Sequence, residues 1–362
     1  MAIHQILVSA APGDAITNQA FELRALLRRV GPSEIFARHV HPAVVGEVLP
    51  LADHIGVAST DGTDLLVFHA SIGEPEVLGF LLTRPERLVL VYHNISPAEA
   101  FRPYDPAFAE LLVEGRRELD LLRDRVTLAI ADSSYNAEEL RALGYADVRV
   151  APLVLDLDGL RSVVPDPHVA AELDGLEGPV VLAVGQMHPH KRPDLVARAF
   201  HLLSSYLIPT ASCYLVGAVR AGGYGTVLRE YVAELNLPRL HLTGSVPLEV
   251  LAAYWRRADV FVTLSEHEGF CVPLVEAMAF DVPIVARAQP AMRETAGDAA
   301  LFLPLSDDPL EMGAELAAEA IAAVLADAPL RDGLVAAGRR RLQAFDPDRA
   351  RAGLLGHLLD AA

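Results

Sequence analysis

Residues 260–279 read Val-Phe-Val-Thr-Leu-Ser-Glu-His-Glu-Gly-Phe-Cys-Val-Pro-Leu-Val-Glu-Ala-Met-Ala. The first five form an apolar run that is typical of a parallel strand covered on both faces. Pro273 suits the first turn of a helix, where its missing N–H group costs nothing. The stretch therefore predicts a buried strand, a short loop and a helix, which is the repeating unit of a doubly wound α/β fold.

The same alternation of short apolar runs and helical segments extends along the whole chain. Helices are expected at residues 18–29 and 107–123, for example, and the last stretch of about 50 residues has a purely helical pattern. Strands are expected at residues 4–9, 35–39, 65–69, 88–92, 127–131 and 148–151, and again at 179–184, 212–216, 239–243, 259–264, 282–286 and 300–304.

A proline-containing connector at residues 162–167 divides these strands into two series of similar size. Two such series predict two doubly wound, Rossmann-like domains facing a central cleft, at residues 1–160 and 175–345. Residues 346–362 are expected to form a C-terminal helix that packs back on the N-terminal domain. Ligands of such folds bind beyond the carboxyl ends of the strands, so functional residues are expected in the loops that follow strands.

Composition limits the classes of partner. The net charge of −18 argues against nucleic acid, whose phosphates would be repelled, and against a strongly basic membrane-docking surface. Cys213 and Cys271 lie far apart in sequence and do not suggest a disulfide framework. The first residues lack the basic segment of a signal peptide, and no apolar stretch approaches the ~20 residues of a membrane span. We therefore expect a cytoplasmic protein.

One side chain stands out because of its rarity. The chain contains 30 Lys and Arg residues, and Lys191 is the only lysine among them. It lies in a loop that begins with Gly185, directly after the apolar run 179–184, and it precedes a helical segment. A glycine after a strand, followed by a cation ahead of a helix, is a common arrangement for phosphate binding. A compact ammonium also reaches a phosphate where a wide guanidinium does not fit. The alternative is an ordinary surface lysine.

A second phosphate-binding feature follows the strand at 260–264. Gly269 lets the backbone approach a ligand closely, and the free N–H groups of residues 272–275 form an anion site at the positive end of a helix dipole. Glu276 lies about one turn into this helix, and Glu268 lies in the loop before it. A diphosphate seat flanked by two carboxylates suits sugars and riboses, which present paired hydroxyls.

Residues 265–278 resemble the signature of the retaining, nucleotide-sugar-dependent glycosyltransferases of family 4, which have the two-domain GT-B fold. The similarity extends over most of the chain, although the other matches are supportive only. They are the loop Gly13-Asp14-Ala15-Ile16-Thr17-Asn18, the segment Tyr92-His93-Asn94-Ile95, and the strand ends Leu215-Val216-Gly217 and Thr243-Gly244-Ser245-Val246.

The resemblance implies a role for each matching residue. Glu276 is expected to bind the ribose and Glu268 the donor sugar, and Lys191 is expected to bind the diphosphate together with backbone amides. Residues 243–246 are expected to contact the base through main chain. His93 is expected to orient donor hydroxyls and to screen charge, so that His93, Lys191 and Glu268 form the catalytic set. The full set of expected donor-binding residues is Gly13, Gly185, Lys191, Arg192, Gly244, Ser245, Val246, Glu268, Gly269, Phe270, Cys271, Val272, Leu274, Val275 and Glu276.

The chain departs from the family at one position. Gln186 stands where the family usually has an arginine that clamps the phosphates together with the lysine. Either Lys191 supplies the charge nearly alone, or the neighbouring Arg192 compensates. Glu266 is close enough in sequence to take the place of Glu268.

Other polar residues have simpler interpretations. His188 and His190 form a His-x-His pair, but with Asp194 as the only further ligand nearby we interpret them as loop residues and expect no metal site. Asp14 and Asn18 begin a helix, so capping and contact with an acceptor are both open. His69 is expected to be structural or close to the acceptor. The arginines of residues 116–125 are interleaved with acidic residues, which favours a solvated helix face over membrane contact.

These features predict a retaining glycosyltransferase that moves a hexose from a nucleotide diphosphate sugar to an acceptor hydroxyl. The acceptor would be a glycan or a lipid-linked sugar in glycan, polysaccharide or glycolipid synthesis, and no cofactor or metal is expected. The family's mechanism implies front-face attack, with the departing phosphate oxygen accepting the proton of the acceptor. Two alternatives stay open: a phosphorylase of the same fold with pyridoxal phosphate on Lys191, and a non-catalytic nucleotide-binding partner subunit, which Gln186 suggests.

Overall fold

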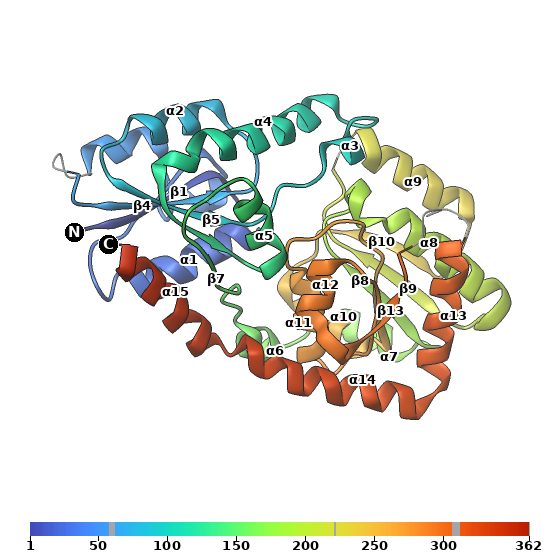
Figure 1. The fold of residues 1–362 in the computed structure, drawn as a ribbon. Helices are drawn as coiled ribbons and strands as arrows, with labels where there is room; N and C mark the ends of the chain where they lie inside the picture. The colour runs from blue at the N-terminus through green and yellow to red at the C-terminus, as the bar shows by residue number, and fades with distance from the viewer. Residues whose placement is uncertain (58–61, 221, 306–311, 362) are drawn as a thin grey trace. The chain divides into compact units, whose positions relative to one another are not determined.

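The computed structural model describes residues 1–57, 62–220, 222–305 and 312–361, and the chain divides into two compact units (Figure 1). The first unit comprises Met1–Ala98, Pro106–Leu155 and Phe345–Ala362, and the second comprises Glu99–Asp105 and Asp156–Ala344. Ala362, the last residue of the expected C-terminal helix, lies outside the described residues. Each unit is built around its own parallel sheet.

The sheet of the first unit has the strand order β3-β2-β1-β4-β5-β6-β7, and all neighbours are parallel. The order reverses between β1 and β4, as in a doubly wound fold. Every strand expected in this half is present, and one short strand, β3, was not expected. The strands are β1 (Ile3–Ala10), β2 (Ile35–Val40), β3 (Leu49–Pro50), β4 (Leu65–Ala70), β5 (Arg87–Tyr92), β6 (Val126–Ala131) and β7 (Val148–Val150).

Helices cover both faces of this sheet. Helices α1 and α15 lie on one face, and α2 and α4 lie on the other (Figure 1). The helices that begin in the first unit are α1 (Ala15–Leu27), α2 (Pro75–Thr83), α3 (Ala98–Phe101), α4 (Pro106–Leu122), α5 (Ser134–Ala142) and α15 (Pro347–Ala361). Helix α3 leads into the short segment Glu99–Asp105, which belongs to the second unit.

Helix α15 completes the core of the first unit. Ala350, Leu354 and Leu358 recur every four residues, which places them on one face of the helix. All three are buried in one hydrophobic cluster with side chains of α1, β1, β4, β5 and β6. Ion pairs of Arg351 with Glu22, at 3.1 Å, and of Arg149 with Asp360, at 2.8 Å, lie at the edge of this contact.

The sheet of the second unit has the order β10-β9-β8-β11-β12-β13, again with parallel neighbours only. The order reverses between β8 and β11, so the loops after these two strands leave the same edge of the sheet side by side. In doubly wound sheets ligands bind at this reversal. The strands, all expected from the sequence, are β8 (Val180–Val184), β9 (Ser212–Val216), β10 (Leu240–Gly244), β11 (Val260–Thr263), β12 (Ile284–Arg287) and β13 (Ala300–Leu303).

The helices of the second unit include the expected helix of the opening stretch, which begins at Val272 with Pro273 in its first turn. Side chains of α8, α9 and α13 share one hydrophobic cluster with β8, β9 and β11. The helices are α6 (Leu157–Ser162), α7 (Pro167–Asp174), α8 (Pro193–Leu202), α9 (Gly223–Leu235), α10 (Leu248–Arg257), α11 (Val272–Ala279), α12 (Pro290–Ala296), α13 (Met312–Ala326) and α14 (Ala328–Arg341).

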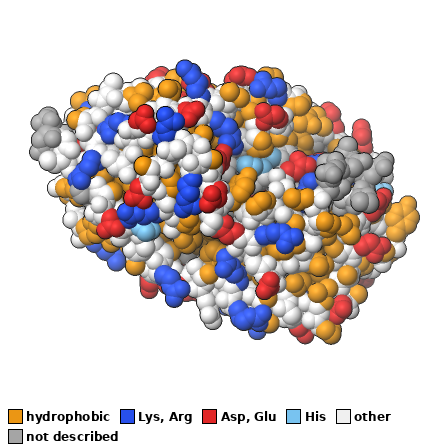
Figure 2. Space-filling view, in the orientation of Figure 1, with side chains coloured by type: hydrophobic (Ala, Val, Ile, Leu, Met, Phe, Trp, Pro, Cys, Tyr) orange, Lys and Arg blue, Asp and Glu red, His pale blue; other side chains and the backbone are white. Residues whose placement is uncertain are grey.

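Charged side chains of both signs are distributed over the surface. Figure 2 shows Lys and Arg side chains interspersed with Asp and Glu side chains on the face that it draws. Within the described residues, no helix has the length and apolar character needed to cross a membrane.

Candidate functional site

The loop after β8 brings Lys191 to the carboxyl edge of the second sheet. Gly185 opens the loop with φ +148°, and the loop after β9 packs directly against it, since a Cβ at Gly217 would lie 1.8 Å from the Gly185 carbonyl oxygen. A short 3-10 turn, Pro189–Lys191, follows, and Arg192 adopts a left-handed conformation (φ 53°) immediately before α8. This sharp turn separates the side chains of the two adjacent cations.

The loop after β11 lies beside it. The Glu266 amide donates a hydrogen bond of 2.7 Å to the His190 carbonyl, which ties the two loops together. Cys271 has φ +70° and ends the loop, so α11 starts abruptly at Val272. The side chain of Thr295 donates to the Phe270 carbonyl at 2.6 Å and holds the loop from the other side. The first N–H groups of α11 thus have a fixed backbone position at the strand reversal.

Lys191 and Glu268 form an ion pair. Lys191 Nζ lies 2.8 Å from Glu268 Oε1, although 77 positions separate the two residues in sequence. Burial favours the neutral amine, but the charge of Glu268 and the hydrogen bond it accepts outweigh burial and raise the pKa of Lys191. The lysine is therefore a persistent cation. The structure thus brings together two of the residues that the sequence placed in the donor site.

Glu276 lies on helix α11, and its carboxylate is free. The described part of the chain supplies no hydrogen-bond partner to its oxygens, and burial raises the pKa of Glu276 to about 7. The charges of Glu268, Lys191 and Glu276 all act on the nearby thiol of Cys271, whose pKa burial raises well above its usual value. Lys191, Glu268, Cys271 and Glu276 therefore form one cluster around the start of α11.

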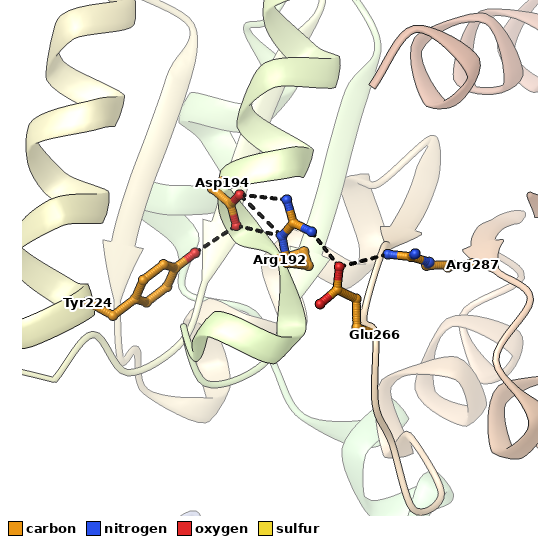
Figure 3. Close-up of polar contacts among 5 residues, drawn as sticks. All are labelled: Arg192, Asp194, Tyr224, Glu266 and Arg287. Atoms are coloured by element: carbon orange, nitrogen blue, oxygen red, sulfur yellow. Dashed lines mark hydrogen bonds and ion pairs between the residues drawn. The ribbon is translucent and has the colours of Figure 1, made fainter. Parts of the chain in front are cut away.

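A second charged network braces the two loops (Figure 3). Arg192 donates to both oxygens of Asp194 at 3.1 to 3.2 Å and to Glu266 Oε1 at 2.5 Å. Arg287, at the end of β12, donates to the same Glu266 oxygen at 3.1 Å. Tyr224 donates to Asp194 Oδ1 at 2.8 Å. The network connects the loops after β8 and β11 with the end of β12 and with helix α9.

This network helps to decide whether Lys191 or Arg192 supplies the positive charge that binds the phosphates. The guanidinium of Arg192 is already shared between two carboxylates, whereas the ammonium of Lys191 has one partner among the described residues, so the geometry favours Lys191 as the main cation. Glu266 likewise faces two arginines rather than Lys191. Gln186 is exposed. The sequence did not predict roles for Arg287 and Tyr224. The one available signal was that Arg287 lies at the end of a strand.

A cavity of about 510 Å³ opens at the carboxyl ends of β9 and β10. Thr243, Gly244 and Ser245, three of the residues expected near the base, line it, together with Ala218 and Val219 from the loop after β9. Helix α9 contributes its remaining wall. Val246, also expected there, does not line this cavity. Gly244 has φ +74°, a conformation that favours glycine.

The expected residues of the first unit lie at the carboxyl ends of its strands. Gly13 forms a left-handed turn (φ +72°) after β1. Asp14 caps α1 by accepting hydrogen bonds from the Thr17 amide and hydroxyl, both at 2.9 Å, so capping explains Asp14. His93 follows β5, and its side chain is only 4% exposed. One ring nitrogen of His93 lies 2.9 Å from His69 and the other 3.2 Å from Asp132.

His188 and His190 are loop residues, as interpreted from the sequence. Their rings pack against Phe101. Burial lowers the pKa of His188 to about 4 and that of His190 well below its usual value. Asp194, the third candidate ligand, is engaged by Arg192 and Tyr224 instead. In the part of the chain that the structure describes, no group of three or more His, Cys, Asp and Glu side chains is arranged to hold a metal ion.

Comparison with known proteins shows a family match over part of the chain and the fold of the whole. Residues 170–341 match the family described as "Glycosyl transferases group 1". A protein of Xylanimonas cellulosilytica named D-inositol 3-phosphate glycosyltransferase is 30% identical over 62% of this chain and 55% of its own length. Its namesake from Geodermatophilus obscurus is 30% identical over 69% of this chain and 55% of its own length. The chain thus spans about half the length of the curated relatives it matches.

Solved structures resemble the whole chain. Sucrose-phosphate synthase from Thermosynechococcus elongatus is 21% identical, with a TM-score of 0.75 over 99% of this chain and 98% of that protein. The Anabaena protein HepE, solved in complex with UDP-glucose, is 17% identical, with a TM-score of 0.75 over 99% and 100% of the two chains. The chain therefore has the GT-B fold with a helical C-terminus, and its residues 170–341 are similar to the group 1 glycosyl transferases.

Proposed function

We propose that this protein transfers a hexose, with retention of configuration, from a nucleotide diphosphate sugar to an acceptor hydroxyl. The observation that carries the proposal is the cluster at the start of α11, where the Lys191–Glu268 ion pair lies beside the N-terminus of the helix and the unpaired carboxylate of Glu276. The family match and the nucleotide-sugar complex of HepE support it. The acceptor would be a glycan or a lipid-linked sugar, and the reaction would take place in the cytoplasm.

Each part of the cluster suits one part of the donor. The N-terminus of α11 and the Lys191 ammonium would bind the diphosphate, because a helix N-terminus and a cation both favour negative charge. Glu276 has no partner of its own and would accept hydrogen bonds from the ribose hydroxyls. The cavity lined by residues 243–245 has room for the base.

Donor binding would rearrange the ion pair. A phosphate that reaches Lys191 competes with the Glu268 carboxylate, which lies 2.8 Å away. Once displaced, Glu268 would be free to accept hydrogen bonds from the sugar. Lys191 and α11 would then stabilise the negative charge that grows on the leaving diphosphate, without a metal ion. Front-face attack would pass the acceptor's proton to the departing phosphate oxygen, so no protein nucleophile is needed.

The charge state of Lys191 favours this reading over a pyridoxal phosphate phosphorylase. A lysine that forms a Schiff base attacks as the neutral amine, and enzymes activate it by lowering its pKa. Here the effect of Glu268 is in the opposite direction, since the pKa of Lys191 is raised.

A panel of nucleotides and nucleotide sugars tests the proposal. The correct nucleoside diphosphate should raise the melting temperature in proportion to the logarithm of its concentration. Transfer from the matching donor should then be followed by NMR, with the anomeric configuration of the first-formed product as the readout. A product with the same configuration as the donor supports retention, and an inverted product refutes it.

A matched control pair separates the site from general charge effects. Lys191→Ala removes the cation of the site, and Arg339→Ala removes the cation of an exposed ion pair with Asp281 in the same unit. We expect the loss of stabilisation by nucleoside diphosphate in the first variant only. Binding of nucleotide without turnover of any donor in the panel would instead indicate a non-catalytic subunit.

A further inference from the structure

A segment from the first half of the chain is built into the second unit. The chain leaves the first unit after Ala98 and returns to it at Pro106, and the residues between them, Glu99–Asp105, belong to the second unit. We call this segment the strap. Of its side chains only that of Phe101 is buried, at 4% exposure. Its contacts in the second unit therefore come from residues that are distant in sequence.

The ring of Phe101 packs against the loop that carries Lys191. Its centroid lies 5.3 Å from that of His188 and 5.4 Å from that of His190, the residues on either side of Pro189. The His188 carbonyl accepts a hydrogen bond of 3.0 Å from the Lys191 amide, and His190 directly precedes Lys191 in the chain. One ring thus contacts both histidines that set the position of the lysine backbone.

The two histidines depend on packing for their own placement. His190 Nδ1 is buried and has no hydrogen-bond partner among the described residues. Burial, and then the charge of Lys191, lower the pKa of His188 to about 4 and that of His190 well below its usual value, so both rings are neutral. Neutral rings add no positive charge beside Lys191 and pack well on an aromatic ring. Aromatic packing therefore carries much of the placement of this turn.

Tyr104 contacts the other side of the turn. Its ring centroid is 5.0 Å from that of Tyr224, the tyrosine that donates to Asp194 in the network around Arg192 (Figure 3). The backbone of Tyr104 also packs closely against the start of α9, because a Cβ at Gly223 would lie 2.6 Å from the Tyr104 carbonyl oxygen. The strap thus also reaches the network that holds Arg192.

The backbone of the turn itself needs support. Arg192 has φ 53°, in the left-handed region that is uncommon for residues other than glycine, and within the described residues no side-chain hydrogen bond caps α8. Such a conformation persists only where the surrounding contacts determine it. The strap supplies some of these contacts, and the Glu266 amide, which donates to the His190 carbonyl, supplies another. Loss of the strap's contacts should therefore let the turn relax and shift Lys191.

We infer that the strap (Glu99–Asp105) positions Lys191 for its anionic ligand, with Phe101 and Tyr104 as positioning residues. The proposed function names that ligand as the diphosphate, and to that extent the inference rests on it. Because the strap is joined at both ends to the first unit, the phosphate site is not complete within residues 156–344. The alternative is that Phe101 only stabilises the second unit, in which case Lys191 would keep its position without the ring.

The environment of Lys191 can be measured without any nucleotide, because it is the only lysine of the chain. An acylating reagent has two amines to react with, Lys191 and the amino terminus, and peptide mass spectrometry gives both rates. Burial lowers the pKa of Lys191, but Glu268 outweighs burial and raises it, and only the neutral amine reacts. Lys191 should therefore react slowly in the wild-type protein. In Phe101→Ala it should react severalfold faster relative to the amino terminus, because its pair with Glu268 loosens.

Further variants separate positioning from a general loss of stability. Phe302→Ala removes a partly buried ring of the same unit that contacts Arg293, and it should leave the rate of Lys191 unchanged. Tyr104→Ala changes a partly buried residue, so it provides the test even if Phe101→Ala does not fold. Phe101→Leu keeps the apolar bulk and should restore most of the slow rate. A wild-type rate in the folded strap variants, or an equal increase in Phe302→Ala, would overturn the inference.

Calorimetry then tests the role of the strap in binding, with the nucleoside diphosphate that the thermal panel selects. Phe101→Ala should bind it roughly tenfold more weakly than the wild type, because a displaced ammonium loses part of its hydrogen-bond geometry. Unchanged affinity in a variant whose Lys191 reacts faster would refute the role of the strap in ligand binding. A wild-type protein that binds no nucleoside diphosphate would instead refute the proposed function, and the acylation rates would still decide whether the strap positions Lys191.

Discussion

Removal of the negative charge of Glu268 should strengthen nucleoside diphosphate binding while it slows sugar transfer. In this structure Lys191 Nζ is 2.8 Å from Glu268 Oε1, so a diphosphate must displace the carboxylate to reach the ammonium. Glu268→Gln keeps the size and shape of the side chain and removes its charge. The free nucleoside diphosphate lacks the hexose that Glu268 is proposed to bind, so its affinity does not depend on a contact between the carboxylate and that sugar.

The degree of burial of the Lys191–Glu268 ion pair gives the expected size of the change in diphosphate affinity. The Glu268 side chain is 9% exposed and that of Lys191 is 26% exposed. The pair thus lies between surface pairs, worth about 0–1 kcal/mol, and buried pairs, whose disruption costs about 3–5 kcal/mol. A contribution of about 1.4 kcal/mol corresponds to diphosphate binding about tenfold tighter. Turnover should fall by roughly 100-fold, because the carboxylate helps most as positive charge develops on the sugar.

Two measurements on one variant check this prediction. Calorimetry gives the dissociation constant of the diphosphate, and steady-state kinetics give the turnover number. Asp281→Asn is the control, since it removes the carboxylate of the exposed pair with Arg339 and should change neither value. Weaker diphosphate binding by Glu268→Gln would show that Glu268 does not compete for Lys191, and unchanged turnover would show that it does not contact the sugar.

Three further predictions concern the same cluster. Lys191→Ala should weaken diphosphate binding by about 2–3 kcal/mol in calorimetry, and Lys191→Arg should restore only part of it because the guanidinium is wider; unchanged affinity in the alanine variant would remove Lys191 from the site. Because the raised pKa of Glu276, about 7, lies above its unfolded value, ionisation of Glu276 costs folding stability as pH rises from about 4.5 to 7. Glu276→Gln should therefore raise the melting temperature more at pH 8 than at pH 5, while it raises the Michaelis constant for the donor; an equal gain at both pH values would contradict the shift. Transfer should continue in excess EDTA, and a complete loss that magnesium or manganese reverses would refute the metal-free proposal.

The sequence predicted the sheets well because most of their strands are short runs rich in apolar residues, with clear breaks between them. The strand β3 (Leu49–Pro50) was missed since two residues, one of them proline, give no periodic pattern. The start of α11 was predicted because Pro273 and Gly269 have local conformational reasons to be there. Such conformational preferences act within a few residues, so they can be recognised in a single sequence.

Contacts between loops were harder to predict. The ion pair of Lys191 and Glu268 depends on β8 and β11 being neighbours, which follows from the strand order and not from any spacing in the sequence. Arg287 belongs to no motif, so its contact with Glu266 had no signal beyond a strand end. The pair of His69 and His93 did have one: each lies at the carboxyl end of a strand, and β4 and β5 are consecutive in the first series.

The burial of helix α15 in the first unit has a consequence for how the chain is made. Ala350, Leu354 and Leu358 complete a core whose other buried members come from residues 3 to 154. During synthesis the first half of the chain emerges long before these leucines. Part of one apolar face of its sheet therefore stays uncovered until nearly all of the second unit has been translated. A fragment that ends at residue 155 would keep that face exposed permanently, and it should aggregate where the whole chain does not.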